Sequence, residues 1–158
     1  MVHLRKFTIH DSENYRRLST SSGDIAQWVP DLVENSPISN ANLVREFVEA
    51  DFATEYDFII CSKIGTPVGA ICASQEPVFN ALNVSYFIGA GYRRLGYMKQ
   101  ALNIFINYCR ESTPYDSLFF DVLPGNKASS NLIENFGAKN IGRFCELVYF
   151  ERYELVLK

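Results

Sequence analysis

Short runs of alternating hydrophobic and polar residues occur along the chain, and longer helical patterns separate them. Alternation over four to eight residues is typical of strands, whereas apolar residues three and four positions apart indicate amphipathic helices. Strands are therefore predicted at residues 4–9, 57–64, 68–74, 83–89 and 117–123, with two more within 139–158. Helices are predicted at residues 11–18, 24–29, 39–50, 95–109 and 126–136.

Several polar residues are placed to begin or end these helices. Asp11 is predicted to cap the first helix, Ser39 or Asn40 the third, and Gly137 to follow the last as a C-cap. The last helix is expected to bury a stripe at Ala128, Leu132 and Phe136. Strand 117–123 is almost wholly apolar, which is typical of a central strand covered on both faces.

The order of these elements predicts the fold class. A strand–helix–strand unit spans residues 83–123, and such units usually form a parallel strand pair. The hairpin at residues 57–74 adds antiparallel pairing. We therefore expect one α/β domain over residues 1–158, with a mixed sheet of six to seven strands flanked by helices.

Composition narrows the functional classes. The net charge is −3 at 21% charged residues, so the basic footprint of a nucleic-acid-binding protein is missing. Residues 1–55 hold nine Asp and Glu residues against five Lys and Arg. This acidic portion suits either a cationic substrate or a solvated helix surface, and the sequence leaves both open.

Cysteine usage and hydropathy bear on location. The four cysteines lack CxxC or metal-binding spacing and sit among apolar residues, so reduced core thiols and no metal site are expected at Cys61, Cys72, Cys109 and Cys145. Reduced thiols favour a cytoplasmic location. The N-terminus has no signal-peptide pattern and no apolar run is long enough to span a membrane, so no membrane partner is expected. A homodimer stays open.

The segment YFIGAGYRRLGYMKQAL, residues 86–102, joins a strand to a helix through glycine and arginine. The first N–H groups of a helix starting near Leu95 lack partners and attract anions. Gly96 lets a phosphate approach the backbone, and Arg93 and Arg94 add positive charge. The segment predicts a diphosphate site, although an ordinary turn has the same residue types. It is neither a P-loop nor a GxGxxG motif.

Two motifs resemble the GNAT acetyltransferase superfamily. The RRLGYM stretch, residues 93–98, is similar to the family's [Q/R]-x-x-G-x-[G/A] turn, with Met98 in place of the small residue. The stretch NKASSNLIENFGA, residues 126–138, is similar to the N-x-x-S helix of the ribosomal-protein N-terminal acetyltransferase-like branch. The element order also resembles the GNAT fold over essentially the full chain.

This resemblance implies acetyl-CoA as the donor. Strands 83–89 and 117–123 would splay apart, and the first would pair its backbone with the pantetheine arm. The diphosphate would bind at the turn before the helix. The cofactor-binding residues implied are Tyr86, Phe87, Ile88, Arg93, Arg94, Leu95, Gly96, Tyr97, Met98, Lys99, Asn126 and Ser129.

The implied reaction is direct transfer of acetyl to a primary amine, either a protein N-terminus or a small amine. The amine must be neutral to attack, so a base should accept its proton. The carboxylates considered for this role are Glu76, Asp121 and Glu146. By motif position Ser129 would assist the departing thiolate, although it could instead satisfy helix backbone groups. Ile133 stands where many relatives carry a catalytic tyrosine, so that tyrosine is not the acid here. Tyr149 is a further candidate acid, although an aromatic on the final strand also suits the core.

An acceptor pocket is expected around Trp28. Three acids lie near it in sequence, namely Asp24, Asp31 and Glu34, and would suit a cationic amine. A structural tryptophan with solvated acids fits the same residues. At the level of the whole chain, a non-catalytic acyl-CoA sensor or a plain interaction domain competes with the enzyme.

Overall fold

The computed structural model describes residues 1–51, 54–145 and 148–158, and within them the strands form one seven-stranded sheet. The strand order is β1-β2-β3-β4-β5-β7-β6. The strands are β1 (Val2–Lys6), β2 (Glu55–Ser62), β3 (Pro67–Gln75), β4 (Ala81–Ile88), β5 (Ser117–Val122), β6 (Lys139–Cys145) and β7 (Tyr149–Val156). Neighbouring strands are antiparallel except β4 and β5, which are parallel, so the predicted mixed sheet is confirmed.

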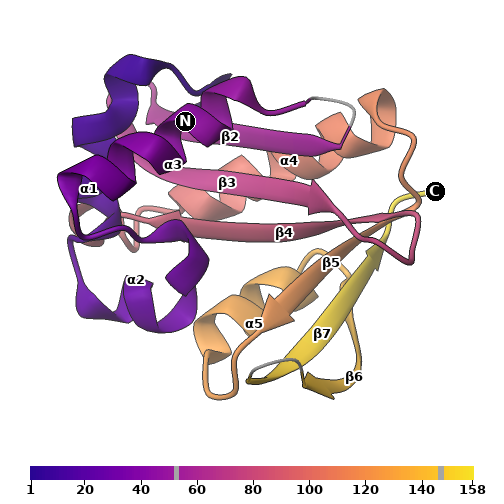
Figure 1. Ribbon diagram of the computed structural model, residues 1–158. Coiled ribbons are helices and arrows are strands. Elements are labelled where there is room, and N and C mark those ends of the chain that lie inside the picture. Colours follow the sequence, from indigo (N-terminus) through magenta and orange to yellow (C-terminus); the bar gives the residue numbers. More distant parts are fainter. Residues whose placement is uncertain (52–53, 146–147) are drawn as a thin grey trace.

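Helices cover both faces of this sheet, as Figure 1 shows. The helices are α1 (Ser12–Ser19), α2 (Gly23–Trp28), α3 (Pro37–Glu49), α4 (Tyr97–Ser112) and α5 (Lys127–Glu134). Short 3-10 turns are η1 (Ile9–Asp11), η2 (Pro30–Leu32) and η3 (Ala90–Tyr92). The first three α-helices pack on one face, and α4 and α5 on the other.

The two faces bury separate apolar clusters, which explains why the central strands read as apolar runs. On β2, Tyr56 and Ile60 face α4, whereas Ile59 and Cys61 face the layer of α1 to α3. Side chains such as Phe105 of α4 are completely buried, and each contributes roughly 1.5–3 kcal/mol.

The feature that positions the site is the short pairing of β4 with β5. β3 pairs with β4 from Leu82 to Ile88, but β4 pairs with β5 only from Ala81 to Asn83. Beyond Asn83 the two strands diverge, and β5, β7 and β6 turn away from the rest of the sheet (Figure 1). The predicted splay is confirmed.

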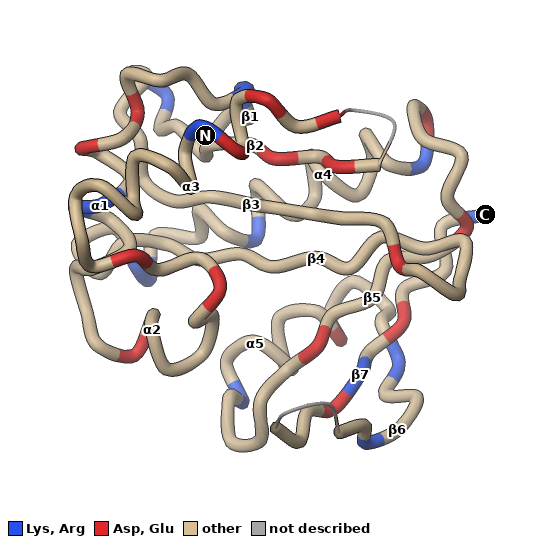
Figure 2. The backbone as a smooth tube through the Cα atoms, in the orientation of Figure 1, with Lys and Arg blue, Asp and Glu red and all other residues tan. Residues whose placement is uncertain are grey.

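Charge surrounds this opening but is missing from its central strands. β3 and β4 contain no Lys, Arg, Asp or Glu, whereas β2, β5 and β7 all carry charged residues (Figure 2). Within the sheet, the charged groups next to the opening therefore come from β5 and β7 and not from β3 or β4.

The predicted cap of α3 is wrong. Ser36 is the N-cap, accepting the Ser39 N–H at 3.5 Å, and Pro37 follows at the first helical position, where its fixed φ is favourable. Asn40 is buried one turn inside and donates to the Ser12 carbonyl at 2.7 Å. Asp11 does precede α1, but its carboxylate binds the Arg5 guanidinium at 2.7 and 2.8 Å instead of capping the helix.

Other boundaries and burial predictions also change. α4 starts at Tyr97 because Gly96, with φ +74°, is left-handed and ends the turn. In α5 the buried residue is Ile133, while Ala128 of the predicted stripe is exposed. Cys145 is exposed on edge strand β6, so it is not the core thiol expected.

Candidate active site

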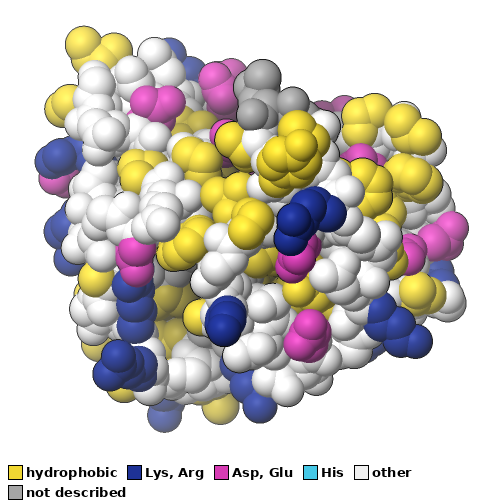
Figure 3. Space-filling view, turned by 90° about the horizontal axis from the view of Figure 1, so that it is seen from below, with side chains coloured by type: hydrophobic (Ala, Val, Ile, Leu, Met, Phe, Trp, Pro, Cys, Tyr) yellow, Lys and Arg dark blue, Asp and Glu magenta, His cyan; other side chains and the backbone are white. Residues whose placement is uncertain are grey.

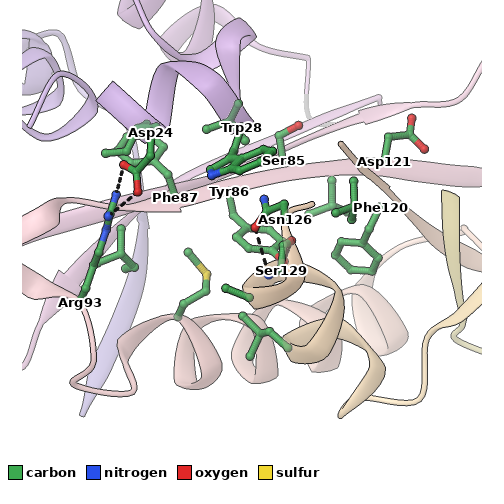
Figure 4. Close-up of a pocket in the computed structure, with 18 residues that line it drawn as sticks. Asp24, Trp28, Ser85, Tyr86, Phe87, Arg93, Phe120, Asp121, Asn126 and Ser129 are labelled. Carbon is green, nitrogen blue, oxygen red and sulfur yellow. Dashed lines mark hydrogen bonds and ion pairs between the residues drawn. The ribbon is translucent and has the colours of Figure 1, made fainter. Parts of the chain in front are cut away.

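A cavity of about 300 Å³ lies where β4 and β5 separate, and we call it the β4–β5 cavity. Residues from both strands, α2 and α5 line it (Figure 4). β4 and β5 are not paired beyond Asn83. The backbone groups of residues 84–88 that face β5 therefore have no strand partner among the described residues. Such edges accept an extended ligand by strand-like hydrogen bonding.

One end of the cavity meets the turn before α4. Arg94 and Gly96 both have left-handed backbone, with φ of 63° and 74°. A left-handed non-glycine residue costs roughly 1–2 kcal/mol, so the turn holds Arg94 in a strained conformation. The N–H groups that open α4 lack helical carbonyl partners. The turn therefore presents successive N–H donors, the arrangement that binds anions.

The arginine nearest the cavity already has a partner. Arg93 donates to both carboxylate oxygens of Asp24 on α2 at 2.8 Å (Figure 4). Hydrogen bonding from this guanidinium lowers the pKa of Asp24 to about 2. Both side chains are more than a third exposed, so the pair is worth only about 0–1 kcal/mol. A diphosphate would have to compete with Asp24 for Arg93.

The start of α5 fixes a hydroxyl inside the cavity. Asn126 caps the helix by accepting the Ser129 N–H at 3.3 Å. The Ser129 Oγ then lies 2.7 Å from the Tyr86 hydroxyl of β4. Figure 4 shows Tyr86, Asn126 and Ser129 close together at the start of α5, with Trp28 of α2 above them in this view. Burial raises the pKa of Tyr86 to about 12.

A second and larger hollow of about 820 Å³ lies on the α1–α3 side of the sheet, and we call it the acidic cleft. Its charged lining consists of six acids and one arginine, namely Asp31, Glu46, Glu55, Asp57, Glu76, Asp121 and Arg152. Four residues line both hollows, namely Trp28, Val29, Ser85 and Asp121. The two hollows therefore meet at the splay. Figure 3 views the molecule from below and shows hydrophobic side chains inside recesses bordered by charged ones.

Two of the acids share one arginine. Arg152 of β7 donates to Asp121 at 2.7 and 2.8 Å and to Glu76 at 3.0 Å. Asn83 of β4 donates to the same two carboxylates at 2.6 and 3.0 Å. Arg152 is only 8% exposed. This network joins β4, β5 and β7 at the point where β4 and β5 part, and occupies both acids.

A third acid, Asp57, is different. It is 7% exposed, and burial raises its pKa to about 7, with a further increase from Glu55 and opposing hydrogen bonds from Cys72 and the Ala73 N–H. No cation is among the groups that shift its pKa. Asp57 pairs with Cys72 in the sheet and Cys72 with Ser85, so one row of residues leads from Asp57 to the splay.

The structure brings together many, but not all, of the residues predicted from sequence. Those lining the β4–β5 cavity are Tyr86, Phe87, Ile88, Arg93, Met98, Asn126 and Ser129. Residues 94–97 and Lys99 lie at the adjoining turn, outside that lining. Glu76 lines the acidic cleft, Glu34 and the exposed Tyr149 line neither hollow, and Glu146 is outside the described residues.

Sequence reasoning missed Asp57, the Tyr86 hydroxyl and the Arg93–Asp24 pair. An acid inside an otherwise apolar strand, as in residues 56–61, was a signal for Asp57, because buried acids are rare. The other two contacts join residues 43 and 69 positions apart, and no local pattern encodes them.

Comparison with known proteins defines the class. The family model for the GNAT acetyltransferase domain matches residues 2–139, so the chain belongs to this family. The predicted class, an acetyl-CoA-dependent N-acetyltransferase, is thereby confirmed. No curated protein sequence matches the chain.

Solved structures share the fold at low identity. A GNAT-family acetyltransferase from Bacillus anthracis is 19% identical with a TM-score of 0.83, and the match covers 99% of this chain and 95% of the Bacillus chain. A ribosomal-protein alanine acetyltransferase from Vibrio fischeri is 15% identical with a TM-score of 0.81 and coverages of 98% and 92%. Spermidine N-acetyltransferase from Vibrio cholerae, solved with CoA and spermine, is 14% identical with a TM-score of 0.83 and coverages of 99% and 95%. The resemblance to the ribosomal-protein branch is thus matched in fold.

Two further findings concern the described residues alone. They hold no group of three or more His, Cys, Asp or Glu residues arranged to bind a metal ion. None of their helices combines the length and apolar character that a membrane span requires.

Proposed function

We propose that this protein acetylates a cationic small amine, with the polyamines as the favoured class, and uses acetyl-CoA bound in the β4–β5 cavity. The observation that carries the proposal is the meeting of the two hollows at Ser85 and Asp121. A donor in one hollow and an acceptor in the other would place their reacting atoms at this junction, which is the main requirement for direct transfer.

The residues at the cavity fit acetyl-CoA. Unpaired backbone groups of residues 84–88 suit the amides of the pantetheine arm, and the N–H groups opening α4 suit the diphosphate. Arg93 can exchange Asp24 for the diphosphate, since a charge-assisted bond contributes about 1.5–3 kcal/mol and the exposed pair less than that. Leu95, Tyr97 and Lys99 would contribute through their backbone. When bound, acetyl-CoA supplies the thioester that donates the acetyl group.

The acidic cleft indicates the class of acceptor. Six acids against one arginine favour a ligand with several positive charges. Among similar structures, one is named as a spermidine N-acetyltransferase and another as a ribosomal-protein acetyltransferase. A protein N-terminus carries one positive charge, so the lining favours the polyamine class. The buried free thiols of Cys61, Cys72 and Cys109 support a cytoplasmic location.

The ammonium form of the acceptor must lose a proton before it attacks. We propose that Asp57 accepts this proton through water, because a pKa of about 7 matches a general base near neutral pH. The row from Asp57 to Ser85 spans two strand spacings, roughly 10 Å, which requires such a bridge. Glu76 is held by Arg152 and Asn83, and it and Glu146 stay alternative assignments.

A thiol-release assay with acetyl-CoA tests the proposal. The panel contains spermidine, spermine, a monoamine and a peptide with a free N-terminus, and calorimetry with CoA accompanies it. We expect turnover with the polyamines at the lowest KM. Turnover with the peptide alone would overturn the acceptor assignment. Binding of CoA without turnover of any amine would support the non-catalytic sensor instead.

A further inference from the structure

One hydrogen bond crosses the opening between the diverging strands. The Tyr86 side chain of β4 and the Ser129 side chain of α5 meet at 2.7 Å, and both line the β4–β5 cavity. Ser130, one position further along α5, behaves differently. Its Oγ donates back to the carbonyls of Asn126 and Lys127 and is not part of the cavity lining. Ser129 is therefore the hydroxyl that α5 presents to the cavity.

Either hydroxyl can donate in this hydrogen bond, and their acidities favour one direction. A phenol with an ordinary pKa of about 10 is a far stronger acid than an alcohol, and hence the better donor. Donation from Tyr86 to Ser129 Oγ is therefore the favoured direction, and it would leave the Ser129 proton available for a second acceptor. Burial raises the pKa of Tyr86 to about 12, so its proton is retained throughout the neutral range.

Tyr86 and Ser129 each make a further contact that fixes the position of the residue. Asn126 accepts the Ser129 N–H and so fixes the first turn of α5. The Tyr86 ring packs edge-on against Phe120 of β5, with ring centroids 6.3 Å apart. Because Ser129 lines the cavity, a ligand atom in the splay can accept its proton, where the proposed function places the donor's reactive end.

We propose that Tyr86 is a positioning residue that orients the Ser129 hydroxyl to donate a hydrogen bond to the sulfur atom of CoA. The inference rests on the proposed function and adds a residue to it. During transfer the amine lone pair forms the C–N bond, the C–S bond breaks, and its electron pair stays on sulfur. Asp57 already holds the proton of the ammonium form, so the second proton on the attacking nitrogen passes to solvent water in the splay. The Ser129 proton stabilises the sulfur anion without leaving oxygen.

The test compares Tyr86→Phe, Ser129→Ala and the double variant with wild-type protein. Tyr108→Phe and Ser130→Ala are the matched controls, since neither residue lines the cavity. The first readout is the pKa of the bound CoA thiol, which is measured from the ultraviolet absorbance of its thiolate as pH is varied. A lost hydrogen bond to the anion should raise that pKa by about one unit in each variant and no further in the double variant. Affinity for desulfo-CoA, which lacks the sulfur, should stay within about twofold.

The second readout is turnover. We expect kcat to fall about tenfold in either single variant with KM nearly unchanged, and the double variant to match them. An unchanged thiol pKa and kcat in Tyr86→Phe would overturn the inference. So would an equal loss of CoA and desulfo-CoA affinity, because that marks a structural brace. Wild-type protein that binds no CoA would instead refute the proposed function and this inference together.

Discussion

The β4–β5 cavity and the acidic cleft lie on either side of the same splay, yet they are built differently. The cavity uses backbone groups of β4, the turn before α4 and the start of α5, and the last two lie within the two sequence motifs. The cleft gathers charged side chains from segments between Asp31 and Arg152. Under the proposed function, local geometry binds the donor, whereas charges brought together by the tertiary fold select the acceptor.

The largest effect should come from Arg152 at the floor of the cleft. Replacing Arg152 by Met leaves the partly buried Glu76 and Asp121 without a cation, which should cost about 3–5 kcal/mol of unfolding free energy near neutral pH. The matched control is Arg143→Met, because Arg143 forms an exposed pair with Glu151 at 3.5 Å and should lose less than about 1 kcal/mol. Urea unfolding measures both. Equal losses would show that the cleft network contributes no more than a surface pair.

Asp57 should give a pH-dependent effect of nearly this size. Its pKa is about 7 in the folded chain against 3.8 ordinarily, so the folded state binds more protons between these values and stability falls as pH rises through them. Asparagine does not ionise, so Asp57→Asn should avoid this loss of unfolding free energy. Relative to wild type, the gain should be on the order of 3–4 kcal/mol above about pH 7 and small below about pH 4. Thermal unfolding of variant and wild type across this range gives the difference. A pH-independent difference would contradict the raised pKa.

On the cavity side, Gly96 tests whether backbone geometry binds the donor. Gly96→Val forces a β-branched residue to φ +74°, which costs roughly 1–2 kcal/mol or shifts the turn. We expect CoA affinity to fall about tenfold or more in calorimetry, with polyamine affinity unchanged. Gly91→Val is the control, because a Cβ there meets nothing within 4 Å and its φ is not left-handed. Equal effects of both substitutions would argue against this turn as the diphosphate site.

The smallest effect concerns the contact between α2 and the turn. Asp24→Asn frees Arg93 from its bidentate partner, so CoA should bind about threefold more tightly at low salt and less so at high salt. Glu13→Gln, which breaks an exposed pair with Arg16 instead, should leave CoA affinity unchanged. Weaker CoA binding in Asp24→Asn would mean that Asp24 holds Arg93 in position for the ligand.

Local patterns predicted the sheet, because period-two runs are encoded in neighbouring residues. The family resemblance carried by the two motifs implied the splay and most of the cavity lining. They failed where a side chain had a distant partner. Asn40 was predicted as a cap, yet it donates to Ser12. Arg93 was assigned to phosphate alone, although Asp24 holds it. Glu76 was considered as a base without its partner Arg152, 76 positions away.

The short parallel pairing between β4 and β5 also bears on how much a bound ligand raises the free energy of unfolding. Backbone groups left without a strand partner along β4 are satisfied by whatever enters the splay. A ligand that bridges both strands binds the folded chain and not the unfolded one, so mass action raises the melting temperature as its concentration increases. Under the proposed function, the resistance of the chain to heat and proteolysis should therefore increase with the concentration of its donor.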